Sequence, residues 1–121
     1  MTVPHALVSL LERYVEEDPA LAGHTLETMT ETEAVTVLKA LKPRFCAQIF
    51  PHLQVTYAAA LLKEIPPTLF GEIVERMRPE QAAAILIHLS HDLRKVLLEY
   101  LSPDIKRELQ ELLTLTENSA G

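Results

Sequence analysis

The side chains that could do chemistry in this chain are a few histidines, one cysteine and an excess of carboxylates. His88 and His91 stand three residues apart, on one edge of a helix, and imidazole is a common zinc ligand. A zinc site needs a third or fourth ligand at a compatible position, and the spacing indicates none. We therefore expect protonation-sensitive surface histidines here.

Cys46 is the one candidate sulfur nucleophile. It stands in a column of a 12-residue repeat that holds alanine or phenylalanine in four other units, which predicts a buried packing role. The chain shows no glycine-rich phosphate loop, no Gly-x-Ser-x-Gly elbow and no Cys-x-x-Cys pair. We expect a protein that is not an enzyme and that works in a reducing, cytoplasmic setting.

Acidic side chains outnumber basic ones, with 17 Asp and Glu against 11 Lys and Arg and a formal net charge of −6. Binding of nucleic acid needs a basic face, so the expected partners are cations or basic protein surfaces, and not nucleic acid. Glu80, Asp92 and Asp104 also have a simpler role. Each opens a helical unit, where a carboxylate facing the helix N-terminus contributes about 0.3 to 1 kcal/mol.

These residues belong to the 12-residue repeat, which runs seven times, from Thr32 to Leu115, without an insertion. Apolar residues at positions 3, 6, 7 and 10 of the unit form one helical stripe. The sixth and tenth columns are aliphatic or methionine throughout: Val37, Ile49, Leu61, Ile73, Ile85, Leu97 and Leu109, and Leu41, Leu53, Ile65, Met77, Leu89, Leu101 and Leu113.

Each unit predicts a helix of about nine residues and a short turn, with proline at the end or at the first position of the next helix. Thr30 and Glu33 have capping-box spacing, and Ser90 and Ser102 stand where N-caps belong. Helices this short are unstable alone in water and must stack. The fixed period therefore predicts an all-α fold of the α-solenoid type.

Upstream of the repeat, residues 4–17 predict an amphipathic helix and residues 20–29 a degenerate short one, together a capping element. The apolar side of the first helix is formed by Leu7, Leu10, Leu11, Tyr14 and Val15.

Gly71 is the only glycine within the repeat, which indicates a packing notch or a weak spot. No apolar run approaches the length of a membrane span.

The stretch LLKEIPPTLFGEIVERMRPEQAAAIL, together with the closing ENSAG, resembles the cytosolic N-terminal domain of MgtE-type magnesium transporters. The similarity covers residues 5–121 and implies a right-handed superhelix of short helices over residues 1–115. In that family an acidic residue shortly before Ala-Gly begins the entry into a tandem CBS module. Glu117, followed by Ala120 and Gly121, matches this, so residues 116–121 are expected to begin a linker to a CBS domain.

The resemblance implies a regulatory function. In this family the N domain and the CBS pair pack together when Mg²⁺ is abundant and separate when it is scarce, which biases a pore. Mg²⁺ retains several waters and can bridge facing carboxylates without an enclosed protein cage. The expected partners are CBS domains of the same polypeptide, the expected parent is membrane-embedded and dimeric, and the domain alone is expected to be a monomer or a weak dimer.

One position matches the family's metal-facing acids directly: Glu80, near the start of a helix. The sequence departs from the family at Ala84 and Gln48, where carboxylates are expected. Nearby acids that could substitute are Glu72, Glu75 and Asp92. We expect a weak, diffuse Mg²⁺ response of these four acids rather than a tight site.

An alternative function is a protein-interaction scaffold whose groove holds a partner helix. The middle region of the flagellar motor switch protein is built from similar helices. Its Glu-His-Pro-Gln motif is absent from this sequence, which lowers that alternative.

Overall fold

A computed structural model describes residues 4–120 of the chain, with side chains as far as residue 117. This part is helical throughout, with short connections and no strand, which confirms the predicted all-α class. The elements are α1 (His5–Glu17), α2 (Pro19–Glu27), α3 (Glu31–Ala40), α4 (Pro43–Ile49), the 3₁₀ turn η1 (Phe50–His52), α5 (Val55–Glu64), α6 (Pro67–Val74), α7 (Pro79–Leu86), α8 (His91–Leu98) and α9 (Pro103–Ala120).

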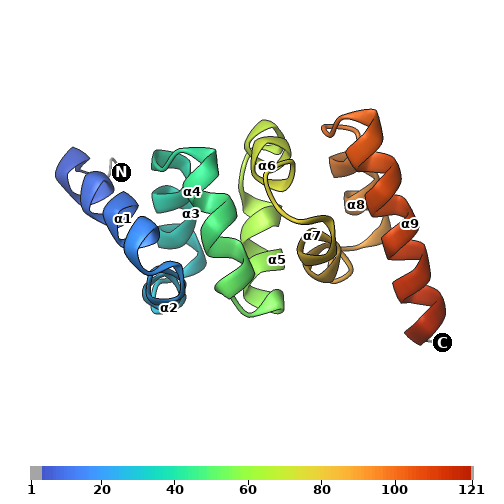
Figure 1. Cartoon of the computed structure of the whole chain (residues 1–121), viewed down its shortest axis with the longest axis horizontal. Helices are drawn as coiled ribbons and strands as arrows, with labels where there is room; N and C mark the ends of the chain where they lie inside the picture. Colours follow the sequence, from blue (N-terminus) through green and yellow to red (C-terminus); the bar gives the residue numbers. More distant parts are fainter. Residues whose placement is uncertain (1–3, 121) are drawn as a thin grey trace.

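The helices follow one another along the long axis of the molecule, with α1 and α9 at opposite ends (Figure 1). From α2 onward, each helix packs mainly on the helix two positions later, so that α2, α4, α6 and α8 form one row and α3, α5, α7 and α9 a second. Helix α1 differs, because its main contacts are with α2 and α4. The superhelix and its right hand remain a prediction.

The repeat columns form the core. Every side chain of the sixth and tenth columns is at most 8% exposed, and the apolar members of the third column are equally buried. The stripe at positions 3, 6, 7 and 10 faces the core, and helices too short to be stable alone gain their stability from this burial. The predicted core is therefore confirmed column by column.

Helix starts follow the predicted chemistry. Proline is the first residue of α4, α6, α7 and α9, where its missing N–H needs no partner. Thr30 and Glu33 form the capping box: the Glu33 N–H donates to Thr30 Oγ1 at 3.2 Å, and the Thr30 N–H donates to Glu33 Oε1 at 3.0 Å. Ser90 Oγ accepts from the Leu93 N–H at 3.3 Å, as expected for an N-cap.

We expect the Thr30→Ala variant to lose about 1 kcal/mol of unfolding free energy, because the orphan N–H groups of the first turn of α3 lose their acceptor. Urea denaturation followed by circular dichroism measures the change. Thr32→Ala is the matched control, since Thr32 is exposed in the same turn and its hydroxyl does not cap the helix. Equal losses in the two variants would show that the cap contributes nothing.

The last helix is longer than the repeat predicts. A unit of about nine helical residues should end by Leu115, whereas α9 continues to Ala120 and spans 18 residues. Residues 116–120 contain no proline or glycine to end the helix, and the Thr116 hydroxyl donates to the Leu112 carbonyl oxygen at 2.9 Å. The segment expected to begin a linker is thus helical as far as Ala120. Among the described residues, no helix is long and apolar enough to cross a bilayer.

Candidate functional site

The four acids predicted to face Mg²⁺ lie on the surface of the second half of the array. Glu72 is in α6 and Glu75 directly follows it, whereas Glu80 and Asp92 stand in the first turns of α7 and α8. All four are exposed. Within residues 4–117, no group of three or more Asp, Glu, His or Cys side chains lies close enough to hold a metal ion. The structure therefore gathers these acids into no enclosed site.

The two neighbouring histidines, His88 and His91, have different surroundings. His88 is exposed at the rim of a shallow cavity that it shares with Lys63 and Thr56. The exposed His91 reaches the end of α9, where its Nε2 lies 3.5 Å from Glu117 Oε1. His91 thus faces a carboxylate and adds a contact between α8 and α9.

An ion pair between a buried arginine and a partly exposed glutamate joins α8 to α9. The Arg94 guanidinium is the one charged group buried among the described side chains, at 5% exposure. Its Nη2 donates to Glu117 Oε1, and its Nη1 donates to the Leu86 carbonyl oxygen at 3.5 Å. A guanidinium removed from water in this way requires a charged partner, and Glu117 supplies it.

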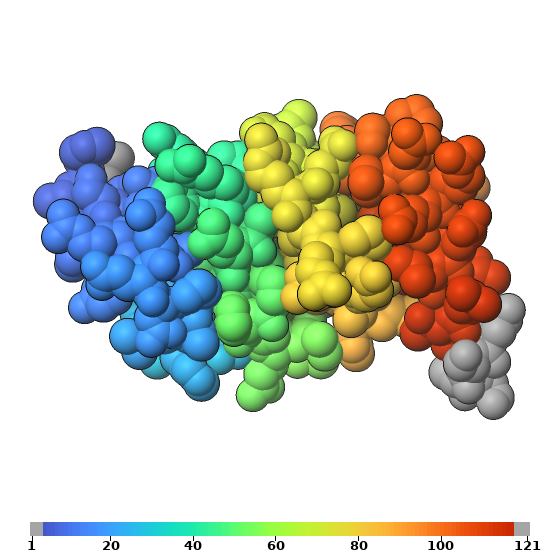
Figure 2. Space-filling model, in the orientation of Figure 1, coloured from blue at the N-terminus to red at the C-terminus, as the bar shows by residue number. Residues whose placement is uncertain are grey.

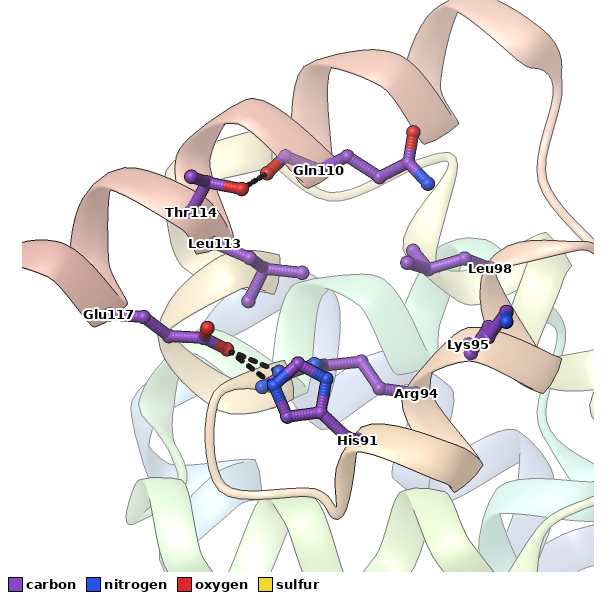
Figure 3. Close-up of a pocket in the computed structure, with 8 residues that line it drawn as sticks. All are labelled: His91, Arg94, Lys95, Leu98, Gln110, Leu113, Thr114 and Glu117. Atoms are coloured by element: carbon purple, nitrogen blue, oxygen red, sulfur yellow. Dashed lines mark hydrogen bonds and ion pairs between the residues drawn. The ribbon is translucent and has the colours of Figure 1, made fainter.

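The ion pair borders an open cavity of about 420 Å³ between α8 and α9 (Figure 3). Leu98 and Leu113 give it an apolar side, while Lys95 and Gln110 add polar groups. In the close-up, His91 and Arg94 both point toward the Glu117 carboxylate (Figure 3). Glu117 therefore compensates the charge of Arg94, and the site ties the end of α9 to the array.

Sequence reasoning did not single out Arg94, although the signal was present. Arg94 is the third residue of its unit, in the column filled by Ala34, Cys46, Ala58, Phe70 and Ala82. A charged residue in a core column indicates either a break in the repeat or a buried pair, and here it is the pair. Lys106 holds the same position in the last unit, where it is partly buried and pairs with Glu99.

Cys46 is fully buried, as predicted, and its Sγ–H donates to the Leu38 carbonyl oxygen at 3.4 Å. Burial raises the pKa of the thiol from 9.0 to about 12, with a smaller contribution in the same direction from the Glu12 carboxylate. A thiol held neutral in this way is a poor nucleophile.

The raised pKa makes stability depend on pH in a defined window. The unfolded thiol ionises near pH 9 and the folded one near pH 12, so its stabilising contribution is complete below pH 9 and is lost as the pH rises toward 12. We expect the unfolding free energy of the wild type to fall more steeply over this window than that of Cys46→Ala. Denaturation curves at successive pH values measure the difference, and parallel curves would contradict it.

The chain is a domain of short helices stacked in two rows, and its surface is acidic. Its buried polar groups serve packing: Cys46 lies in the core, and Arg94 pairs with Glu117. The model of one family, described as the MgtE intracellular N domain, matches residues 17–118. The chain therefore belongs to the MgtE intracellular N domain family, which confirms the resemblance. This is a family of transporter domains rather than of enzymes, and its N domain is the cytoplasmic domain of a magnesium transporter. A search of curated proteins found no match to the chain.

Proposed function

We propose that this chain is a non-catalytic regulatory domain that responds to Mg²⁺ by packing against a CBS pair of the same polypeptide. The observation that carries the proposal is the family match over residues 17–118. The parent protein is a magnesium transporter or a CBS-domain sensor. The domain supplies one of two surfaces, and the free energy of Mg²⁺ binding, available only in the packed state, shifts the equilibrium between packed and separate forms.

The surface acids support this mode of sensing. Glu72, Glu75, Glu80 and Asp92 are exposed, and none forms an ion pair within the described part of the chain. Facing carboxylates on a second surface would repel them. A hydrated Mg²⁺ between the two surfaces removes that repulsion and accepts oxygen ligands from both sides.

The structure also suits a role in which motion is transmitted along the chain. Arg94 and Glu117 hold the end of α9 against α8, so the direction of the C-terminal helix is fixed relative to the array. If α9 is rigid, a change in how the array docks is transmitted through α9 to the segment that follows it.

The affinity of the chain for a CBS pair supplied as a separate protein tests the proposal. We expect calorimetry to show tighter binding in millimolar Mg²⁺ than in its absence, and a loss of this difference in a variant with Glu72→Gln, Glu75→Gln, Glu80→Gln and Asp92→Asn. The matched control neutralises four other exposed acids, Glu31, Glu64, Glu108 and Glu111, and should keep the difference.

Two results would contradict the proposal. One is an affinity for the CBS pair that Mg²⁺ leaves unchanged. The other is an equal loss in the two four-acid variants, which would reduce the effect to net charge. Binding of Mg²⁺ to the chain alone with a dissociation constant of about 1 μM would contradict the open-surface mode, because such affinity needs an assembled set of ligands.

A further inference from the structure

Helix α1 forms one end of the molecule and presents apolar side chains to solvent. Leu7, Leu10 and Tyr14 are 42%, 48% and 43% exposed. Their spacing of three and four residues places them on one stripe of the helix. The predicted apolar side of this helix is therefore divided, because a neighbouring stripe packs into the core: Val8, Leu11 and Val15.

The first 33 residues, which form α1, α2 and the start of α3, carry the net negative charge of the chain. Residues 1–33 contain seven of the 17 acids but only one of the 11 bases, Arg13, so the rest of the chain has ten of each. Glu16 and Glu17 are exposed at the end of α1, and neither takes part in an ion pair of the described residues. Glu17 follows Tyr14 by three residues and so continues the exposed stripe.

An apolar stripe that ends in carboxylates is complementary to an amphipathic helix with a basic flank. A second copy of the chain fits poorly, because the exposed Glu16 and Glu17 carboxylates of two copies would face each other. An anionic membrane is repelled for the same reason. The α1 end lies opposite α9, the helix that carries the C-terminal end of the chain (Figures 1 and 2).

We propose that the exposed stripe of α1, formed by Leu7, Leu10, Tyr14 and Glu17, is a docking surface for a basic amphipathic helix of a separate partner protein. The leucines and the tyrosine supply the apolar contact, and Glu16 and Glu17 pair with lysine or arginine on the flank of the partner helix. This surface is independent of the Mg²⁺ response, since it lies on the first helix and the four predicted Mg²⁺-facing acids lie on and after α6.

Labelled peptides of about 18 residues test the proposal, one with leucine and lysine at amphipathic spacing and one with glutamate in place of lysine. We expect fluorescence anisotropy to show binding of the lysine peptide only, weakened by salt. Leu7→Ser, Leu10→Ser and Tyr14→Ser together should weaken it at least roughly tenfold. Glu16→Gln with Glu17→Gln should remove most of the salt dependence.

Val96→Ser with Leu115→Ser is the matched control, because these side chains are 56% and 63% exposed on α8 and α9. It should bind the lysine peptide as the wild type does. The proposal is overturned if the lysine peptide does not bind, if the glutamate peptide binds equally, if the control loses as much, or if the chain dimerises through α1. If the triple serine variant unfolds, the variant with Glu16→Gln and Glu17→Gln provides the test, since both side chains lie on the surface. Unchanged salt dependence of peptide binding in that variant would then overturn the proposal.

Discussion

Replacing Gly71 by alanine is expected to lower the free energy of unfolding by about 1 to 3 kcal/mol, although alanine is the better helix former. A Cβ at this position would lie 2.8 Å from the Tyr100 carbonyl oxygen. That oxygen belongs to the backbone after α8 and cannot rotate away, so α6 and this segment must separate. The predicted packing notch is thus a close approach of two backbones.

The measurement is chemical denaturation of Gly71→Ala beside Gly23→Ala. Both glycines are buried in helices, so the gain in helix propensity is the same. At Gly23 the nearest atom to an added Cβ is the His52 Cβ at 3.1 Å, a contact that a small shift relieves. We expect Gly23→Ala to be close to neutral. A stable Gly71→Ala protein would mean that the notch between α6 and the segment after α8 is wider than the structure shows.

Glu117→Ala is expected to lower the unfolding free energy by about 2 to 3 kcal/mol, because Arg94 would remain buried without its carboxylate. Arg94→Met should cost less, about 1 kcal/mol or below, since the third column accepts apolar side chains and the partly exposed Glu117 can turn to water. The double variant should be more stable than Glu117→Ala alone. Equilibrium denaturation of the three variants gives the coupling energy between the two side chains.

A second readout separates this ion pair from general helix stability. Glu117→Ala should speed hydrogen exchange of backbone amides in the last two turns of α9, because Glu117 ties that part to Arg94 and His91 of α8. Glu111→Ala is the matched control, since Glu111 is exposed on the same helix and the change in helix propensity is the same. An equal increase in exchange rate in the two variants would show that the Arg94–Glu117 pair does not hold the end of α9 in place.

The repeat predicted most of this fold because burial in a stacked array depends directly on position. Leu61 and Ile73 are fully buried, since every residue of the sixth column lies on the stripe that packs into the core. Caps were predictable for the same reason: Thr30 and Glu33 need only local spacing. Cys46 was placed correctly because its column is small or apolar in the first five units.

The features that were missed depend on neighbours distant in sequence. Arg94 is a charged residue in a column that is apolar in the first five units. Its partner Glu117 lies 23 residues later, and only the packing of α9 against α8 brings the two together. The end of α9 at Ala120 was missed because the repeat period carries no information on the residues after its last unit. Division of the α1 face into a buried and an exposed stripe depends on how the first helix packs against α2 and α4, which no local pattern specifies.

The Mg²⁺ response is proposed from the family match, because the fold assembles no metal site from the four acids. Four acids are exposed on the surface but do not form a metal-binding cluster among the described residues: Glu72, Glu75, Glu80 and Asp92. The proposed response therefore requires a second surface, and we propose that a CBS pair supplies it.

Small-angle X-ray scattering of a protein in which this chain precedes a CBS pair tests the proposed Mg²⁺ response most directly. We predict that the radius of gyration falls when Mg²⁺ is raised to millimolar concentration and rises again when the ion is chelated. The variant with Glu72→Gln, Glu75→Gln, Glu80→Gln and Asp92→Asn should no longer require Mg²⁺ to become compact, because the repulsion that the ion offsets is gone. A radius of gyration that is the same with and without Mg²⁺ in the wild type would contradict the proposed Mg²⁺ response.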